Sequence, residues 1–225
     1  MKLTLEQINK IPDVQERERL KQNIIAGYEN QKATAAREDF LTFVKRMWPQ
    51  FIEGKHHKEV SEKFNKIASG ELTRLIINMP PRHTKSEFAS YFLPAWMIGN
   101  YPDLKIIQAT HTAELAVNFG RKTKNLIDSE PYQKLFTTRL QEDSKAAGRW
   151  NTSKGGEYFA VGVQGAVTGR GADLLIIDDP HSEQDINSPN AFEKTYEWYT
   201  SGPRQRLQPG GRIILVMTRW SKKDL

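Results

Sequence analysis

Four short apolar runs follow Gly70, and turn residues bound each of them: 75–78 (LIIN), 105–108 (KIIQ), 174–177 (LLII) and 213–216 (IILV). Three consist almost wholly of Ile, Leu and Val, which is typical of strands buried on both faces of a parallel sheet. A further strand is expected at 158–163, before a glycine-rich segment. The pattern predicts a mostly parallel sheet covered by helices.

Helical periodicity fills the chain around these runs. Apolar residues recur at helical spacing over 57–68, 85–99 and 113–127, whereas the first fifty residues show only helical patterns, at 5–10, 14–29 and 36–48. We therefore divide the chain into an N-terminal helical lid or adaptor, residues 1–50, and a core, residues 51–225. The predicted core is a doubly wound α/β fold, whose ligands bind beyond the carboxyl ends of the strands.

The segment MPPRHTKS, which ends at Ser86, lies between the first predicted strand and its helix. Aligned on Lys85 and Ser86, it is a GxxxxGK[ST] loop in which Met79 and Thr84 replace both glycines, so the sequence does not match the motif as it is usually written. The order of strand, short loop, Lys-Ser and helix nevertheless directs backbone N–H groups and a helix N-terminus toward a phosphate. Thr84 requires a backbone conformation that glycine would adopt more easily. The alternative is a proline-rich turn with a basic cap.

If the loop binds a nucleotide, its residue types suggest their roles. Lys85 reaches the β- and γ-phosphates, the Ser86 hydroxyl is a ligand of Mg²⁺, and Arg82 offers a guanidinium fork to phosphate oxygens. The expected nucleotide-binding set is Pro81, Arg82, His83, Thr84, Lys85 and Ser86.

The third run ends in two carboxylates, as LLIIDDP over 174–180. In a Walker B element, Asp178 would hold the Mg²⁺ shell and Asp179 would polarise the attacking water. The alternative is a strand that ends in an ordinary Asp-Asp-Pro turn. Because this pair and Lys85 both follow buried strands, the two motifs together favour a nucleotide site more than either does alone.

A glycine-rich segment, residues 162–173, precedes the acidic strand and carries one cation, Arg170. An arginine delivered to a γ-phosphate stabilises the charge of the transition state. The alternative is a surface turn with a solvated arginine, and the residues alone favour that alternative.

Composition narrows the class of protein. The net charge of +6 modestly favours a polyanionic partner, although the basic residues after Ser201 are also typical of a solvated face. The absence of cysteine excludes disulfides and Cys-ligated metal sites. No apolar run has the length of a membrane span and Met1 does not open a signal peptide, so we expect a cytosolic protein without a membrane partner.

Together the motifs resemble the large terminase subunits of tailed bacteriophages from about residue 51 to residue 225. The matching strings are PPRHTKS (80–86), TGRGAD (168–173), IIDDP (176–180) and MTRW (217–220), and Thr84 departs from the PPRHGKS that is frequent in the family. The resemblance implies an N-terminal ATPase domain with a RecA-like, additional-strand P-loop NTPase fold, which uses ATP and Mg²⁺ to drive double-stranded DNA into a procapsid.

The resemblance also assigns roles to residues. Lys85, Ser86 and Asp178 match the phosphate and magnesium positions, and Asp179 matches the catalytic carboxylate. Arg170 matches an arginine finger that acts on a neighbouring subunit, and Thr218 matches the motif that couples the γ-phosphate state to movement. The adenine contact is expected at His56 or His57, and candidate DNA-phosphate contacts on helix 113–127 are Arg121, Lys122 and Lys124.

The implied partners are double-stranded DNA, the portal protein, the small terminase subunit and further copies in a ring on the procapsid, within the host cytoplasm. The isolated chain is expected to be a monomer. Family members carry a second, nuclease domain, and because this sequence ends after the coupling motif we expect no DNA cleavage from it.

Two other functions remain open. A superfamily 2 helicase or another DNA-remodelling ATPase also pairs a P-loop with an acidic strand end, but it needs a second RecA-like domain. A nucleotide-dependent binding module without turnover is compatible with the missing glycines and the short Asp179 side chain.

Overall fold

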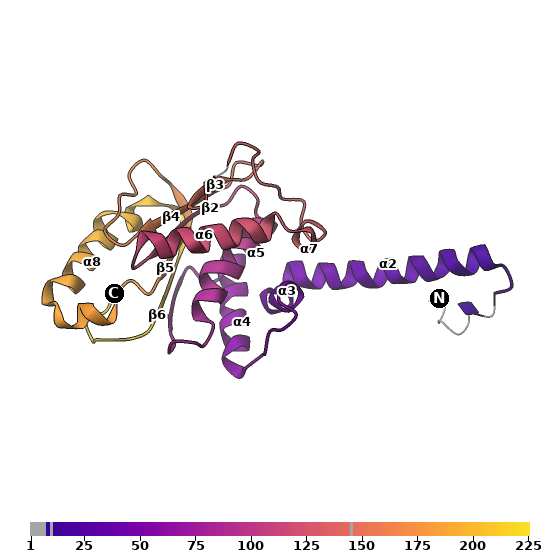
Figure 1. Cartoon of the computed structure of the whole chain (residues 1–225), viewed down its shortest axis with the longest axis horizontal. Helices are drawn as coiled ribbons and strands as arrows, with labels where there is room; N and C mark the ends of the chain where they lie inside the picture. The colour runs from indigo at the N-terminus through magenta and orange to yellow at the C-terminus, as the bar shows by residue number, and fades with distance from the viewer. Residues whose placement is uncertain (1–7, 10, 145) are drawn as a thin grey trace.

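The computed structural model describes residues 8–9, 11–144 and 146–225 of the chain, and element labels follow Figure 1. Within these residues the strands form one six-stranded sheet in the order β1-β6-β5-β2-β4-β3, and only β3 is antiparallel to its neighbour. The strands are β1 (Arg74–Asn78), β2 (Lys105–Thr110), β3 (Arg149–Asn151), β4 (Glu157–Gly162), β5 (Ala172–Asp178) and β6 (Leu207–Met217). The predicted mostly parallel sheet is confirmed, and β3 is an addition that the sequence pattern did not indicate.

Helices cover both faces of the sheet, which explains the uninterrupted apolar runs. Along β5, Leu174 and Ile176 pack into one core, and Leu175 and Ile177 pack into the core on the other face. The first core lies under α4 (Lys55–Ser69), η1 (Glu87–Phe92), α5 (Leu93–Asn100) and the end of α6 (Ala113–Ile127), and the second lies under α8 (Pro189–Ser201). Short helical turns complete the chain: α7 (Glu130–Gln133), η2 (Glu183–Asn187) and η3 (Pro203–Arg206).

The strand register brings the carboxyl ends of the five parallel strands to one edge of the sheet. Asn78 pairs with Met217, Thr110 pairs with both Gly162 and Asp178, and the first residues of β2 and β4 pair at the opposite edge. We call the first edge the carboxyl edge and the second the amino edge. Both predicted chemical motifs therefore follow strands that end at the carboxyl edge.

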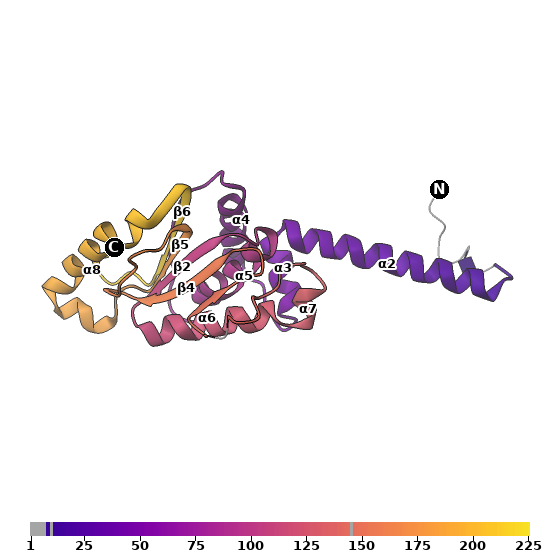
Figure 2. The same cartoon turned by 90° about the horizontal axis from the view of Figure 1, so that it is seen from above.

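The N-terminal region differs from the predicted pair of helices at 14–29 and 36–48. One 25-residue helix, α2 (Val14–Glu38), runs without a break and projects from the body in both views (Figures 1 and 2). No glycine or proline lies between Glu29 and Ala36, so nothing ends the helix there. The chain breaks at Asp39 instead, whose carboxylate accepts a hydrogen bond from the Thr42 N–H at 2.7 Å and caps α3 (Phe40–Met47).

The predicted helix at 5–10 lies mainly outside the described residues. Neither α2 nor any other helix of the described residues is long and apolar enough to cross a membrane.

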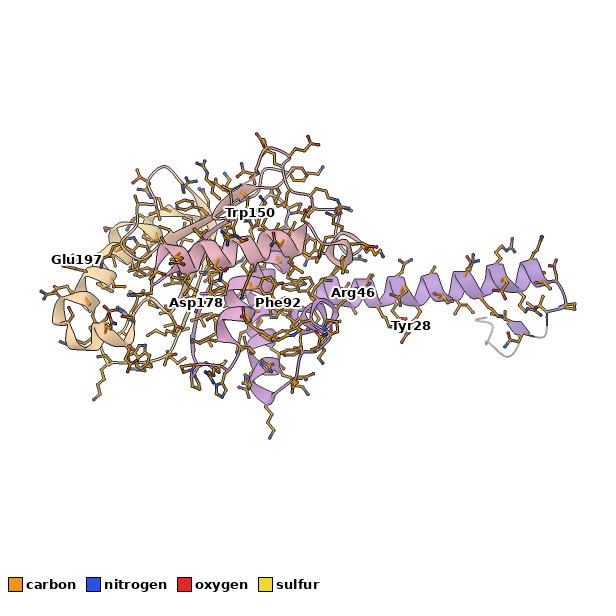
Figure 3. The ribbon with its side chains drawn as sticks, viewed as in Figure 1. Tyr28, Arg46, Phe92, Trp150, Asp178 and Glu197 are labelled. Atoms are coloured by element: carbon orange, nitrogen blue, oxygen red, sulfur yellow. The ribbon has the colours of Figure 1, made fainter. Side chains whose placement is uncertain are left out.

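Phe40 joins the N-terminal helices to the core. Its ring packs edge-on against Phe64, Phe88 and Trp96, with centroid distances of 5.2, 5.3 and 5.6 Å. The side chain is fully buried in the same core as the strands, although it precedes the division that we place at residue 50. Tyr28, near the middle of α2, lies outside the body of the protein (Figure 3).

We therefore expect Phe40→Ala to lower the free energy of unfolding by about 3–5 kcal/mol, because it leaves a cavity among three aromatic rings. Tyr28→Ala is the matched control: its side chain is 59% exposed, and the change should stay within about 0.5 kcal/mol. Urea denaturation followed by circular dichroism measures both. Equal losses from the two variants would contradict the assignment of Phe40 to the core.

Candidate nucleotide-binding site

The predicted phosphate loop connects β1 to a helix that begins at Lys85, at the carboxyl edge. Its backbone enters the left-handed region twice, at Arg82 (φ 63°) and Thr84 (φ 62°). The N–H of Met79 donates to the carbonyl of Met217 at 3.0 Å, so the start of the loop is tied to the end of β6. A tight turn leads directly from the strand into the helix, as phosphate binding at a helix N-terminus requires.

Lys85 and Asp179 form the central ion pair of the site. The Lys85 ammonium lies 2.7 Å from an Asp179 carboxylate oxygen, and the Lys85 side chain is only 7% exposed. A buried ammonium is costly unless an anion accompanies it. The pair therefore places the predicted phosphate lysine beside the predicted catalytic carboxylate.

Asp178 is buried between two serine hydroxyls. Ser86 donates to one carboxylate oxygen at 3.0 Å and Ser90 donates to the other at 2.6 Å. Burial raises the pKa of Asp178 to about 6, and the charge of Asp179 acts in the same direction, whereas the two serine hydrogen bonds oppose the shift. The two predicted magnesium ligands, Ser86 and Asp178, are thus in direct contact.

Sequence reasoning did not identify Ser90 or its partner Gln108. The Gln108 side chain donates to the Ser90 hydroxyl at 3.0 Å, so it directs the Ser90 proton toward Asp178. Two signals were present: Ser90 stands four residues after Ser86 on the same helix, and Gln108 is a polar residue within an apolar strand. The helix is a π-helix at this point, η1, a conformation that is often found at functional sites.

Asp179 also contacts the predicted coupling residue. The Thr218 N–H donates to an Asp179 carboxylate oxygen at 2.7 Å, and the Asp179 N–H donates to the Val216 carbonyl at 2.8 Å. Asp179 itself has a φ of 44°. The turn after β5 is therefore held against the end of β6 by backbone and side-chain hydrogen bonds.

His57, a candidate adenine contact, lies in the core of the site. One ring nitrogen, Nδ1, accepts from the Gly54 N–H at 2.7 Å, and Nε2 lies 2.6 Å from the Thr84 hydroxyl. Because both nitrogens are engaged, a hydrogen bond from His57 to a base would have to break one of these contacts. The adjacent His56 ring lies 3.8 Å from that of His57, between centroids.

Three further loop residues, Pro81, Arg82 and His83, are exposed. The Pro81 carbonyl lies 2.9 Å from Nδ1 of His83. The Arg82 guanidinium is therefore accessible to an approaching anion.

Arg170 lies away from the other site residues. Its guanidinium pairs with Glu157, the first residue of β4, and stacks 3.8 Å from the centroid of Phe159. It precedes Ala172, where β5 begins, at the amino edge. Six residue steps at about 3.3 Å place that end of β5 roughly 20 Å from Asp178. The structure therefore does not bring Arg170 to the nucleotide site of its own chain.

The candidate DNA contacts on α6 differ in their surroundings. Arg121 is exposed. Lys122 pairs with Glu87 at 3.3 Å, and the Lys124 ammonium donates to the Ser144 carbonyl at 2.8 Å. Two of the three predicted cations are thus engaged within the chain.

Comparisons with known proteins support the fold. No protein-family model and no curated protein sequence matches this chain. Among solved structures, the crystal structure of the HK97 bacteriophage large terminase is similar, with a TM-score of 0.51 and 12% sequence identity. The likeness covers 81% of this chain and 37% of that one, so the chain spans well under half of the terminase. The α/β fold with its mostly parallel sheet is consistent with a terminase-like RecA or P-loop fold, and the predicted fold class is confirmed.

The raised pKa of Asp178 makes a prediction about the unliganded protein. A carboxyl whose pKa rises on folding, here from 3.8 to about 6, contributes stability that is fully present below pH 3.8 and is lost as the pH rises through about 6. Asp178→Asn removes this titration. The wild type loses this stability between pH 5 and pH 8, whereas Asp178→Asn does not. The free energy of unfolding of Asp178→Asn minus that of the wild type should therefore be about 1–2 kcal/mol larger at pH 8 than at pH 5. Urea denaturation without Mg²⁺ measures the difference, and a difference independent of pH would contradict it.

Proposed function

We propose that this chain binds Mg-ATP at the 79–86 loop and hydrolyses it. One observation carries the proposal: Lys85, Ser86, Asp178 and Asp179 meet within hydrogen-bonding distance, although Ser86 and Asp178 are 92 residues apart in sequence. A lysine and a hydroxyl after one buried strand, facing two carboxylates after another, are the groups with which P-loop NTPases bind a triphosphate and its metal.

Ser86 and Asp178 fit a magnesium ion. Both offer hard oxygen ligands, and their oxygens are already 3.0 Å apart. The described residues hold no cluster of three or more His, Cys, Asp or Glu side chains that could bind a metal, but Mg²⁺ is commonly held by one or two protein ligands together with phosphates and waters. When bound, the ion would neutralise charge on the phosphate oxygens.

Lys85 and Asp179 have complementary roles in this proposal. Lys85 exchanges the Asp179 carboxylate for phosphate oxygens, because a buried ammonium needs one anion or the other. Asp179, with a side chain that is 31% exposed, is then free to accept a proton from the attacking water. Arg82 adds a second cation from the exposed side of the loop.

Thr218 would link this exchange of partners at Lys85 to the chain that follows β6. Its N–H is bonded to the Asp179 carboxylate, so a change of partner at Asp179 alters a contact of the segment that follows β6. Coupling between sites requires a contact that differs between two states, and this hydrogen bond supplies one.

The cellular role that we propose is the motor domain of a phage DNA-packaging terminase. The likeness in fold to the HK97 large terminase supports it, as do the four matching motifs. The proposed partners are double-stranded DNA, the portal protein, the small terminase subunit and other copies of this chain in a ring, docked on a procapsid in the host cytoplasm. Exposed Arg121 is the first candidate among the three α6 cations for contact with DNA phosphates.

A phosphate-release assay with and without double-stranded DNA tests the proposed hydrolysis. We expect Asp179→Asn to retain Mg-ATP binding and to lose turnover by about 10²–10⁴-fold, because it removes the proton acceptor but not the metal ligands. Asp173→Asn makes the same change at the other end of β5, where the side chain contacts the Lys105 N–H, and should leave turnover unchanged. Equal rates for Asp179→Asn and the wild type would contradict the role of Asp179.

A second prediction follows from the distance between Arg170 and its own site. We propose that Arg170 acts on the nucleotide of a neighbouring copy, so turnover per chain should rise with protein concentration. Arg170→Ala should bind ATP almost normally and lose about 10³-fold or more in turnover, because the charge it offsets develops in the transition state. Arg149→Ala is the matched control, since Arg149 also lies beside Glu157, at 3.8 Å, but has no proposed role.

Mixing two inactive variants separates action between copies from action within one. Arg170→Ala supplies an intact site and Asp179→Asn an intact arginine, so a mixture should regain part of the hydrolysis that each lacks alone. A mixture that stays inactive at concentrations where the wild type is active would show that Arg170 does not act across copies.

A further inference from the structure

The phosphate loop contains a residue that its backbone conformation does not favour. Thr84 has a φ of 62°, in the left-handed region where a Cβ atom crowds the following carbonyl oxygen. Glycine enters this region freely, whereas a β-branched side chain there is uncommon and persists only when its surroundings hold it. The turn before Lys85 therefore needs a contact that a glycine loop would not need.

A chain of hydrogen bonds supplies that contact. The Gly54 N–H donates to Nδ1 of His57 at 2.7 Å, and Nε2 of His57 lies 2.6 Å from the Thr84 hydroxyl. The Thr84 hydroxyl in turn donates to the His83 carbonyl at 2.6 Å. The hydrogen bonds thus run without a gap from Gly54, the N-cap of α4, to the backbone of the loop.

The direction of this chain is fixed by its first member. Because Nδ1 accepts a hydrogen bond, a neutral His57 ring carries its proton on Nε2 and donates it to Thr84. Burial lowers the pKa of His57 to about 4, and the neighbouring His56 acts in the same direction, so the ring is neutral near pH 7. The Thr84 hydroxyl, with its own proton on the His83 carbonyl, is free to accept.

The His57 ring is itself held in place. It is 5% exposed and packs against Phe51 and Phe88, with centroid distances of 4.7 and 5.0 Å. Phe88 also donates its N–H to the Thr84 carbonyl at 2.9 Å, the first hydrogen bond of the helix. The ring and the loop residue therefore share a neighbour, Phe88.

We propose that His57 is a positioning residue of the phosphate loop, which holds the Thr84 side chain and so maintains the left-handed turn that glycine would otherwise provide. His57 and Thr84 then act as one unit in place of the usual glycine. The consequence for ATP affinity rests on the proposed function, but the conformational role does not. His57 contributes to nucleotide binding through Thr84 and not through contact with the base.

The test compares the loss of His57 in two loop backgrounds, the natural loop with Thr84 and the Thr84→Gly variant. His57→Phe keeps a ring between Phe51 and Phe88 and removes both hydrogen bonds. In the natural loop it should accelerate hydrogen exchange of the Phe88 amide, whose N–H donates to the Thr84 carbonyl, by about tenfold, the factor that corresponds to one lost hydrogen bond. We call the rate at this amide the loop exchange. In the Thr84→Gly background the same change should have little effect on loop exchange, because glycine holds the turn unaided.

Three further variants make the test specific. Thr84→Val keeps the shape of the side chain without the hydroxyl, so its loop should exchange as fast as that of His57→Phe, even if the latter is destabilised in its core. Thr84→Ser keeps the hydroxyl and should retain most of the protection. Lys58→Ala is the matched control, since Lys58 is the exposed neighbour of His57 on α4 and pairs with Glu53, at 3.3 Å, so loop exchange should not change.

The same variants in calorimetry with Mg-ATP show the consequence for binding. Affinity should fall about tenfold on His57→Phe in the natural loop and should change little in the Thr84→Gly background. Equal effects of His57→Phe on loop exchange in both backgrounds, or no effect in either, would overturn the proposal. A wild-type protein that does not bind Mg-ATP would instead refute the proposed function, while the exchange measurements would still decide the role of His57.

Discussion

The ion pair between Lys85 and Asp179 joins two strands that are not neighbours in the sheet. Lys85 follows β1 and Asp179 follows β5, and β6 runs between them. Because the Lys85 ammonium is almost fully buried, it requires an anion, and in the unliganded chain a carboxylate at the end of β5 is that anion. The same requirement can be met by a phosphate. In the function that we propose, this cation pairs either with the Asp179 carboxylate or with a phosphate, and Asp179 is free to act on water only in the second case.

Backbone strain gathers at the same edge of the sheet. In the described part of the chain, non-glycine residues with a positive φ are Arg82, Thr84, Gln164 and Asp179, and each follows a strand that ends at the carboxyl edge. Such conformations cost of order 1–3 kcal/mol each and persist where the surrounding structure holds them. At Asp179 and Thr84 this support comes from hydrogen bonds with Thr218 and His57, and both residues belong to the candidate site.

Much of this arrangement was predictable because its signals are local. Strands buried on both faces consist of uninterrupted apolar residues, and the segments that follow them lie at the edge where ligands bind in α/β folds. Asp178 at the end of one run, and Lys85 after a short loop, were therefore both predicted to lie at that edge. The contact of His57 with Thr84 depends on how α4 approaches the loop, 27 residues away in sequence, and no local pattern encodes that distance. The position of Arg170 at the amino edge, by contrast, follows from the sequence, because Arg170 stands just before β5 begins, and only its pairing with Glu157 is tertiary. The sequence shows that Ser90 stands four residues after Ser86. That both serines donate to Asp178 depends on where the fold places Asp178.

The proposed function depends most on Lys85, which we propose binds the phosphates of a magnesium nucleotide. Titration calorimetry of ATP into the wild type and into Lys85→Ala, with and without Mg²⁺, tests it most directly. Asp179, which the substitution leaves without its partner, is partly exposed and can be solvated, so the fold should survive, as circular dichroism would show. We predict one Mg²⁺-dependent binding site for the wild type and no detectable binding for a folded Lys85→Ala. The same affinity in both proteins would show that Lys85 does not bind the phosphates.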